Sequence, residues 1–190
     1  MPRKEPAPIY QLKVTLNNAK PPIWRRILVS GNTRLDQFHD ILQITMGWTD
    51  SHLHQFVLGD TFYGMRDDED SFFGMDKEDE RKYKLSQLLT QEKDSMKYEY
   101  DFGDDWEHKI VLEKKLPHDS SVTVPSCIKG KRACPPDDCG GVWGYQKLVE
   151  VMRDPSDNEY KEKLEWLGGE FDPEHFDIAK INQSLARYAQ

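Results

Sequence analysis

The chain has 190 residues, of which 37% are hydrophobic and 11% aromatic, and this is enough apolar material for a single domain with a sizeable core. Its 34 acidic and 26 basic residues give a formal net charge of -8, the wrong sign for a protein that wraps nucleic acid over a broad surface. A local basic patch is compatible with this balance. We expect the partner to be a protein or a small-molecule ligand.

The sequence also argues against membrane insertion and export. No apolar run reaches the roughly 20 residues that a membrane helix needs, and residues 1–8, which should be a flexible N-terminus, lack the apolar stretch of a signal peptide. We therefore expect a cytoplasmic protein. Its three cysteines should then be thiols or metal ligands and not a disulfide framework.

Hydrophobic spacing predicts a ββαββ order in the first third of the chain. Residues 10–16 alternate between apolar and polar side chains, and residues 23–29 resume a β-branched run, so the two segments should form an antiparallel hairpin. Apolar residues at three- and four-residue steps predict a helix over 34–46. Residues 53–58 and 61–63, joined by a Gly-Asp pair, have the composition of a second hairpin.

The rest of the chain divides into an acidic loop, a hairpin, a turn-rich loop and a helical region. Residues 66–80 hold eight acidic and two basic side chains, a balance that favours a surface loop. Residues 97–113 predict two strands, and residues 117–141, rich in Pro, Gly and Cys, predict an irregular loop. Residues 142–190 read as helices, the last of them starting near Asp172.

These elements together predict an α+β fold. Its sheet should be mixed and largely antiparallel, with a β-grasp-like ββαββ core that the helices cover and with further helices at the C-terminus.

The segment 98–108, Tyr-Glu-Tyr-Asp-Phe-Gly-Asp-Asp-Trp-Glu-His, is the strongest indication of a functional site, because a core alone does not explain so many polar side chains. If the turn lies between Asp104 and Asp105, Asp101 faces His108 across the hairpin. Such a pair could act as a general base, bind a metal ion, or simply stabilise a turn by a hydrogen bond, and the sequence leaves these three interpretations open.

A pair of histidines suggests a metal site nearby. His52 and His54 are two residues apart, so on a strand both imidazoles would lie on the same face. Together with Asp101 or His108 they could bind a divalent transition metal such as zinc, which acidifies bound water for hydrolysis. The alternative is that these histidines cap turns and bond backbone groups beneath aromatic side chains.

Cys127, Cys134 and Cys139 pose a separate question, since their spacing differs from the paired Cys-x-x-Cys of most structural zinc sites. Three thiolates and an imidazole could still complete a tetrahedral zinc site that orders the loop. Free buried thiols are the alternative.

Tryptophans and arginines could line a recognition pocket, although the tryptophans could equally fill the core. The complete set of candidate cleft residues is His52, His54, Asp101, Asp104, Trp106, His108, Arg25 and Arg132.

Four sequence blocks resemble a known family. They are Pro-Pro-Ile-Trp-Arg-Arg-Ile at 21–27, Gly-Trp followed by His-Leu-His-Gln-Phe within 47–56, Tyr-Asp-Phe-Gly-Asp with Trp and His within 100–108, and Pro-Pro-Asp-Asp-Cys-Gly-Gly at 135–141. In this order they are similar to the plasmid pRiA4b ORF-3-like family over nearly all of the chain, with Asp137-Asp138 where relatives often have Glu-Asp. The resemblance implies an uncharacterised bacterial or archaeal α+β protein, and some relatives are labelled resolvase-like proteins of mobile elements.

Recombination chemistry is not visible in the sequence, because it needs an activated serine beside several arginines or a tyrosine with an Arg-His-Arg cluster. Our first hypothesis is a binding or accessory module with a polar cleft formed by the candidate residues. The alternative is a metal-dependent hydrolase that uses the same His/Asp cluster.

Overall fold

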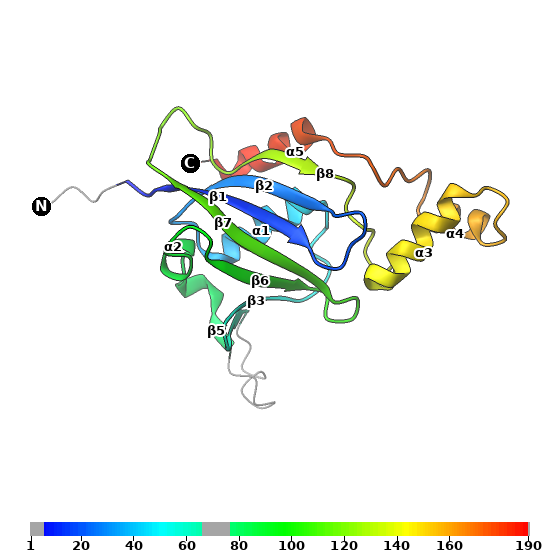
Figure 1. The fold of residues 1–190 in the computed structure, drawn as a ribbon, viewed down its shortest axis with the longest axis horizontal. Coiled ribbons are helices and arrows are strands. Elements are labelled where there is room, and N and C mark those ends of the chain that lie inside the picture. The colour runs from blue at the N-terminus through cyan, green and yellow to red at the C-terminus, as the bar shows by residue number, and fades with distance from the viewer. Residues whose placement is uncertain (1–5, 66–76, 190) are drawn as a thin grey trace, which may run out of the picture.

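The fold is an eight-stranded sheet with helices packed on one of its faces (Figure 1). The computed structural model describes residues 6–65 and 77–189; most of the expected flexible N-terminus and of the expected acidic loop therefore lies outside the described residues. The strands are β1 (Ile9–Leu16), β2 (Trp24–Ser30), β3 (His54–Leu58), β4 (Thr61–Gly64), β5 (Lys77–Asp79), β6 (Ser95–Tyr100), β7 (Trp106–Leu116) and β8 (Ser126–Lys131). The α-helices are α1 (Leu35–Met46), α2 (Leu85–Leu88), α3 (Gly141–Arg153), α4 (Tyr160–Trp166) and α5 (Ile178–Leu185), and two short 3-10 helices cover Glu80–Lys82 and Ala186–Tyr188.

The strand order is β5-β4-β3-β6-β7-β1-β2-β8, and every neighbouring pair is antiparallel except β4 with β5. This confirms the predicted α+β class with a mixed, largely antiparallel sheet, and the ββαββ order of the first five elements is also as predicted. The two hairpins of that unit are not adjacent, however. The β6–β7 hairpin lies between them, so it forms the centre of the sheet.

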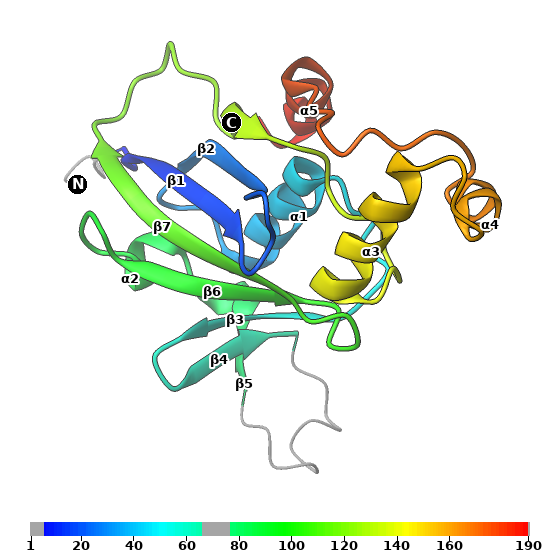
Figure 2. The ribbon, with the colours of Figure 1, turned by 45° about the vertical axis from the view of Figure 1, so that its right-hand side comes forward.

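The core lies between the sheet and α1. Alternate residues of β1, such as Leu12 and Val14, point to this side and are fully buried, as the period-two pattern predicts. Helix α1 contributes Phe38 and Leu42 at helical spacing from the opposite wall. Figure 2 shows α1 behind β1 and β2, while no helix of the described residues crosses the front of these strands. One face of the sheet is therefore covered and the other is open.

Two segments that the sequence predicted as loops contain strands. Lys77–Asp79, at the end of the predicted acidic loop, pairs in parallel with β4, and Glu80 begins a 3-10 turn. Ser126–Lys131, inside the predicted 117–141 loop, pairs with β2 and forms one edge of the sheet. Neither segment has a clear apolar alternation, so the strand forms through backbone pairing with an existing edge and not through local propensity.

The outer edge of β8 is occupied by α5. The side-chain amide of Asn182 accepts a hydrogen bond from the Cys127 N–H at 2.7 Å and donates one to the Cys127 carbonyl at 2.9 Å. Helix α5 begins later than the predicted Asp172, because Asp177 is its N-cap and accepts a hydrogen bond from the Lys180 N–H at 3.0 Å.

None of the helices in the described residues is long and apolar enough to cross a membrane.

Candidate functional site

Three loops from distant parts of the sequence meet at one end of the sheet: the segment between α1 and β3, the turn joining β6 to β7, and the segment before α3. The Asp101 N–H donates to the Leu53 carbonyl at 2.9 Å, which joins the first loop to the second. The Gly140 N–H donates to Asp104 Oδ2 at 3.1 Å, which joins the second to the third. Trp48 Nε1 donates to the Pro135 carbonyl at 3.0 Å and closes the triangle.

Gly141 shows how tightly two of these loops meet. It has a φ of +65°, and a Cβ atom there would lie within van der Waals overlap of the Asp104 carbonyl oxygen. Only glycine fits this position, so the end of the third loop must hold glycine for Asp104 to reach the start of α3.

His52, Asp101 and Asp138, which we call the His52 cluster, come one from each loop. His52 Nε2 lies 3.6 Å from Asp101 Oδ2 and 3.4 Å from Asp138 Oδ1, and the three ligand atoms all lie within 4.8 Å of one another. His52 Nε2 is buried and has no hydrogen-bond partner. These contacts are too long or too poorly aligned for hydrogen bonds, so the imidazole nitrogen lies near two carboxylates without bonding to either.

The turn itself sets the orientation of Asp101. Its Oδ1 accepts hydrogen bonds from the N–H groups of Gly103 at 3.0 Å and Asp104 at 3.2 Å, which leaves Oδ2 to face His52. The Asp101 side chain is buried, and among the described residues no lysine or arginine pairs with it. A buried carboxylate without a cationic partner is costly unless a cation compensates it.

The spacing of the His52 cluster fits a metal ion. Around a tetrahedral zinc with bonds of roughly 2.1 Å, neighbouring ligand atoms stand about 3.4 Å apart, close to the two distances at His52 Nε2. Asp137 lies next to this cluster, and its Oδ1 is also buried without a partner. Burial raises the pKa of the Asp137 carboxyl, and the nearby His52 opposes this shift.

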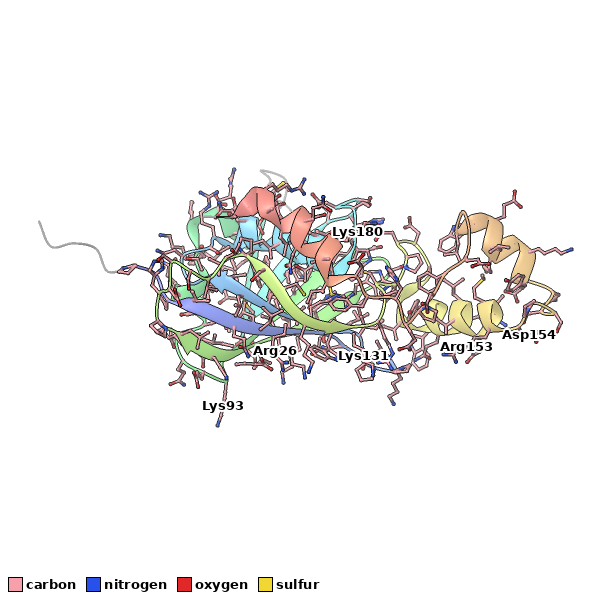
Figure 3. The ribbon with its side chains drawn as sticks, turned by 90° about the horizontal axis from the view of Figure 1, so that it is seen from above. Arg26, Lys93, Lys131, Arg153, Asp154 and Lys180 are labelled. Atoms are coloured by element: carbon pink, nitrogen blue, oxygen red, sulfur yellow. The ribbon has the colours of Figure 1, made fainter. Side chains whose placement is uncertain are left out.

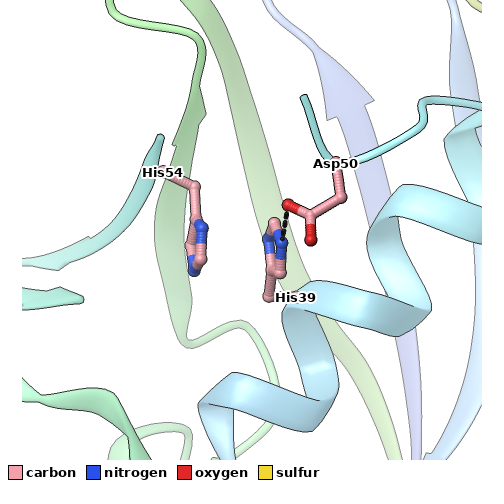
Figure 4. A group of neighbouring side chains, drawn as sticks. All are labelled: His39, Asp50 and His54. Carbon is pink, nitrogen blue, oxygen red and sulfur yellow. Dashed lines mark hydrogen bonds and ion pairs between the residues drawn. The ribbon is translucent and has the colours of Figure 1, made fainter. Parts of the chain in front are cut away.

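A second group of histidines and carboxylates, which we call the His39 cluster, consists of His39, Asp50, His54 and Glu80. His39 Nε2 is 2.8 Å from Asp50 Oδ1, and His54 Nε2 is 2.9 Å from Glu80 Oε2. The two imidazole rings are stacked, with centroids 3.4 Å apart and planes 7° from parallel, as Figure 4 shows for His39 and His54. Burial, and then the neighbouring His54, lower the pKa of His39.

The His39 cluster does not fit an ion as it stands, although three of its ligand atoms lie close together. Nitrogen lone pairs lie in the ring plane, and two stacked parallel rings cannot both direct them at one ion. His39 Nε2 and His54 Nε2 are already hydrogen-bonded to carboxylates, and His39 Nδ1 is 2.8 Å from the Tyr98 hydroxyl. This cluster is a satisfied hydrogen-bond network.

The prediction that His52 and His54 share one ion is therefore wrong. His52 lies in the loop before β3, whereas His54 is the first residue of β3 and is buried against α1. The two side chains belong to different clusters. Both nevertheless line one cleft of about 820 Å3, together with His39, Asp50 and Glu80.

The predicted pairing of Asp101 with His108 is also wrong. His108 pairs with Tyr98, and Trp106 pairs with Tyr100, so the turn spans the five residues 101–105. Asp101 and Asp105 both have positive φ, which a two-residue turn centred on Asp104 and Asp105 does not describe. Trp106 and His108 are fully buried in the core, and burial lowers the pKa of His108 to about 4.

The two candidate arginines lie elsewhere. Arg25 is buried and donates from Nε to the Thr45 carbonyl at 2.9 Å and from Nη2 to the Met46 carbonyl at 3.4 Å, so it caps the C-terminus of α1. Arg132 donates to Glu174 at 2.8 Å and to the Pro22 carbonyl at 2.9 Å. Neither arginine lines the cleft that holds His52.

The structure does not bring the three cysteines together as one group of ligand atoms. Among the described residues, the groups of ligand atoms close enough to share an ion contain no cysteine. Burial raises the pKa of Cys127, Cys134 and Cys139, to about 12 for Cys139, so the thiols keep their protons. This arrangement matches the alternative of free thiols.

Sequence reasoning missed Asp138, the third member of the His52 cluster, and three members of the His39 cluster. Asp138 lies in the Pro-Pro-Asp-Asp-Cys-Gly-Gly block, and its place in that block could have identified it as a candidate site residue. His39 lies on the buried face of α1, where its spacing resembles that of a core residue. Asp50 and Glu80 carried no comparable signal.

The fold and the site define an α+β protein with a His/Asp cluster at the junction of three loops. The family model described as plasmid pRiA4b ORF-3-like protein matches residues 8–180. The chain belongs to this family, as its four sequence blocks predicted.

Two similar proteins are described without a function. The chain is 37% identical over 181 residues to the uncharacterized protein y4hQ of Sinorhizobium fredii, and the match covers 94% of this chain and 91% of that relative. The crystal structure of MM3350, a protein of unknown function from Methanosarcina mazei Go1, has a TM-score of 0.80 and 39% identity, covering 90% of this chain and 96% of that one.

Proposed function

We propose that this protein is a binding module that holds a divalent metal ion at the His52 cluster and presents it to a ligand in the adjoining cleft. One observation carries the proposal. The buried His52 Nε2 has no hydrogen-bond partner and stands 3.4 Å and 3.6 Å from carboxylate oxygens of two other loops, at the separation of ligands around one ion.

The surroundings support the proposal. Two backbone N–H groups hold Asp101 Oδ1 and fix its orientation, as outer hydrogen bonds do for metal ligands. Three protein ligands leave coordination positions free for water or for a bound ligand. One imidazole with two carboxylates suits zinc or manganese better than a thiolate-preferring metal.

Metal titration tests the proposal most directly. Tag-free protein, stripped with a chelator and titrated with zinc and with manganese in a calorimeter, should bind one ion per chain. Asp101→Asn should weaken binding severely, because Asn keeps the Oδ1 acceptor of the turn but replaces Oδ2 with an amide nitrogen that cannot ligate a cation. Asp105→Asn, at an exposed position of the same turn, is the matched control and should bind normally.

The histidine ligand allows an independent test. His52→Ala should lose the ion, whereas His118→Ala, at an exposed position, should keep it. Absence of binding by the unaltered protein, or equal binding by Asp101→Asn and Asp105→Asn, would contradict a metal at this cluster.

A metal-dependent hydrolase is the second candidate, favoured because the His52 cluster adjoins a cleft of about 820 Å3. A metal-bound water there could attack a ligand in the cleft. Metal-loaded protein should then hydrolyse p-nitrophenyl acetate or p-nitrophenyl phosphate faster than His52→Ala does. If the unaltered protein binds the metal but hydrolyses the probes no faster than His52→Ala, hydrolysis of these probes is excluded and the binding module remains.

A further inference from the structure

The open face of the sheet carries the opposite charge to the protein as a whole. Its central strands and β8 expose seven basic side chains and three acidic ones on this face, although the chain has a net charge of -8. The basic residues are Lys13, Arg26, Lys97, Lys109, Lys114, Lys129 and Lys131, and the acidic residues are Glu99, Glu107 and Glu113. Figure 3 shows Arg26 and Lys131 on the side of the molecule opposite to Lys180 of α5.

The register of the strands arranges all of these cations except Lys114 in two rows. In one row Lys129 lies beside Arg26, which lies beside Lys13. The second row runs from Lys131 of β8 through β2, β1 and β7 to Lys97 of β6. With strands about 4.8 Å apart, this row spans roughly 19 Å.

Three cross-strand neighbours in these rows have the same charge: Lys13 with Arg26, Arg26 with Lys129, and Lys97 with Lys109. Like charges directly opposite each other destabilise a sheet. Acidic side chains offset only part of this repulsion. Arg26 pairs with Glu113, and Lys97 pairs with Glu99 and Glu107.

The remaining lysines of the two rows are Lys13, Lys109, Lys129 and Lys131. Within the described residues none of these has a carboxylate partner at ion-pair distance. A polyanion lying across the sheet would compensate all of them at once.

An aromatic ring belongs to the second row, where Trp24 pairs with Lys131 on one side and Thr15 on the other. Trp24 is partly exposed, the Lys13 Nζ lies 5.4 Å from its ring centroid, and the Arg26 guanidinium lies 5.3 Å from it. An aromatic ring flanked by cations on an open sheet can stack a nucleobase while the cations hold the neighbouring phosphates. A peptide rich in Asp and Glu would use the cations but not the ring.

We propose that this face binds single-stranded nucleic acid, with the phosphodiester backbone along the lysine rows and a base on Trp24. A broad sheet face does not enter the grooves of a duplex, so a single strand fits it better. The proposal is independent of the metal site, because it involves none of the residues of the His52 cluster. Because binding relies on contacts between lysines and phosphates, it should weaken as the salt concentration rises.

Fluorescence anisotropy with a labelled oligothymidylate of about 20 nucleotides tests the proposal. The full chain should bind at about 50 mM potassium chloride. A plot of the logarithm of the association constant against the logarithm of the salt concentration should have a slope of about -3, because four unpaired lysines displace counterions from the phosphates. The double variant Lys13→Glu/Lys109→Glu should bind at least about tenfold more weakly.

The matched control is Lys161→Glu/Lys180→Glu, which changes the net charge equally at exposed positions away from this face and should bind clearly better than the first double variant. Trp24→Leu should weaken binding without lowering the salt slope, because it removes stacking and keeps the charges. Circular dichroism checks that each variant is folded. The proposal would be overturned if the full chain did not bind at low salt, or if both double variants lost the same affinity. It would also be overturned if a duplex or polyglutamate bound as tightly as the single strand or more tightly.

Discussion

The His52 cluster and the His39 cluster contain the same kinds of side chain, and His52 lines the same cleft as the His39 cluster, but the two clusters differ in how their polar atoms are satisfied. In the His39 cluster the nitrogen-to-oxygen distances are 2.8 Å and 2.9 Å, and both carboxylates bond an imidazole. In the His52 cluster the distances are 3.4 Å and 3.6 Å, and the imidazole nitrogen has no bond. The polar atoms of the His39 cluster are therefore paired without an ion, whereas those of the His52 cluster are not, although the two clusters contain similar residues.

The largest expected effect concerns stability at the His39 cluster. His54→Ala removes the only partner that the described residues give to the buried carboxylate of Glu80, so the free energy of unfolding should fall by about 4 kcal/mol. Urea denaturation measures this. His54→Phe/Glu80→Leu should lose less than the single variant, because no buried charge is left. A loss from His54→Ala below about 1 kcal/mol would show that the pair is not buried in solution.

A pH titration extends the comparison to His108, which has no hydrogen bond or ion pair with a carboxylate of the described residues. Its pKa is about 4 in the folded protein and 6.5 for the unperturbed side chain, so the unfolded chain binds the proton first as the pH falls. The contribution of neutral His108 to the free energy of unfolding is fully present above pH 6.5. It should decrease as the pH falls toward 4, by about 3 kcal/mol in total. Thermal unfolding of His108→Met should show a flatter pH dependence over this window. If His108→Met showed the same pH dependence of stability as the unaltered protein, groups other than His108 would be responsible for it.

Metal affinity should separate the two clusters. Asp101→Asn should weaken zinc binding by about 100-fold or more, equivalent to about 2.7 kcal/mol, because it removes a ligand oxygen. Asp50→Asn makes the same chemical change in the His39 cluster and should leave affinity unaltered. Competition with a chromophoric chelator measures both constants. If Asp50→Asn were the variant that lost zinc, the roles of the two clusters would be reversed.

The smallest effect is expected for the stability of Asp50→Asn. The Asp50 side chain is 57% exposed, so water replaces much of what its bond to His39 contributes, and the loss should stay below about 1 kcal/mol. The urea midpoint is the measurement. A loss as large as that of His54→Ala would mean that the network acts as one unit.

Much of the fold was predictable because its strands alternate or follow turn residues. The pattern from Tyr10 to Leu16 predicted β1, and the spacing of Leu35, Phe38 and Leu42 predicted α1. Strand β8 was not predictable, since Ser126–Lys131 becomes a strand only by pairing with β2. Its alternation is weak and its neighbours are turn residues.

The site was predictable only in part. His52 and Asp101 were identified from their residue types, but the error in the hairpin turn placed His108 beside Asp101 instead of in the core. Asp138 lies 37 residues beyond Asp101 in the sequence, and tertiary contacts, of Gly140 with Asp104 and of Pro135 with Trp48, bring its loop to the cluster. Such proximity depends on tertiary structure and leaves no periodic signal.

The amide of Asn182 limits how far the sheet can extend. An exposed edge strand offers unpaired N–H and C=O groups to any neighbouring strand, and this is a common route to aggregation. On β8 one side chain occupies both groups of Cys127, as a ninth strand would. Helix α5 therefore hinders a strand of another copy from pairing at this edge of the sheet.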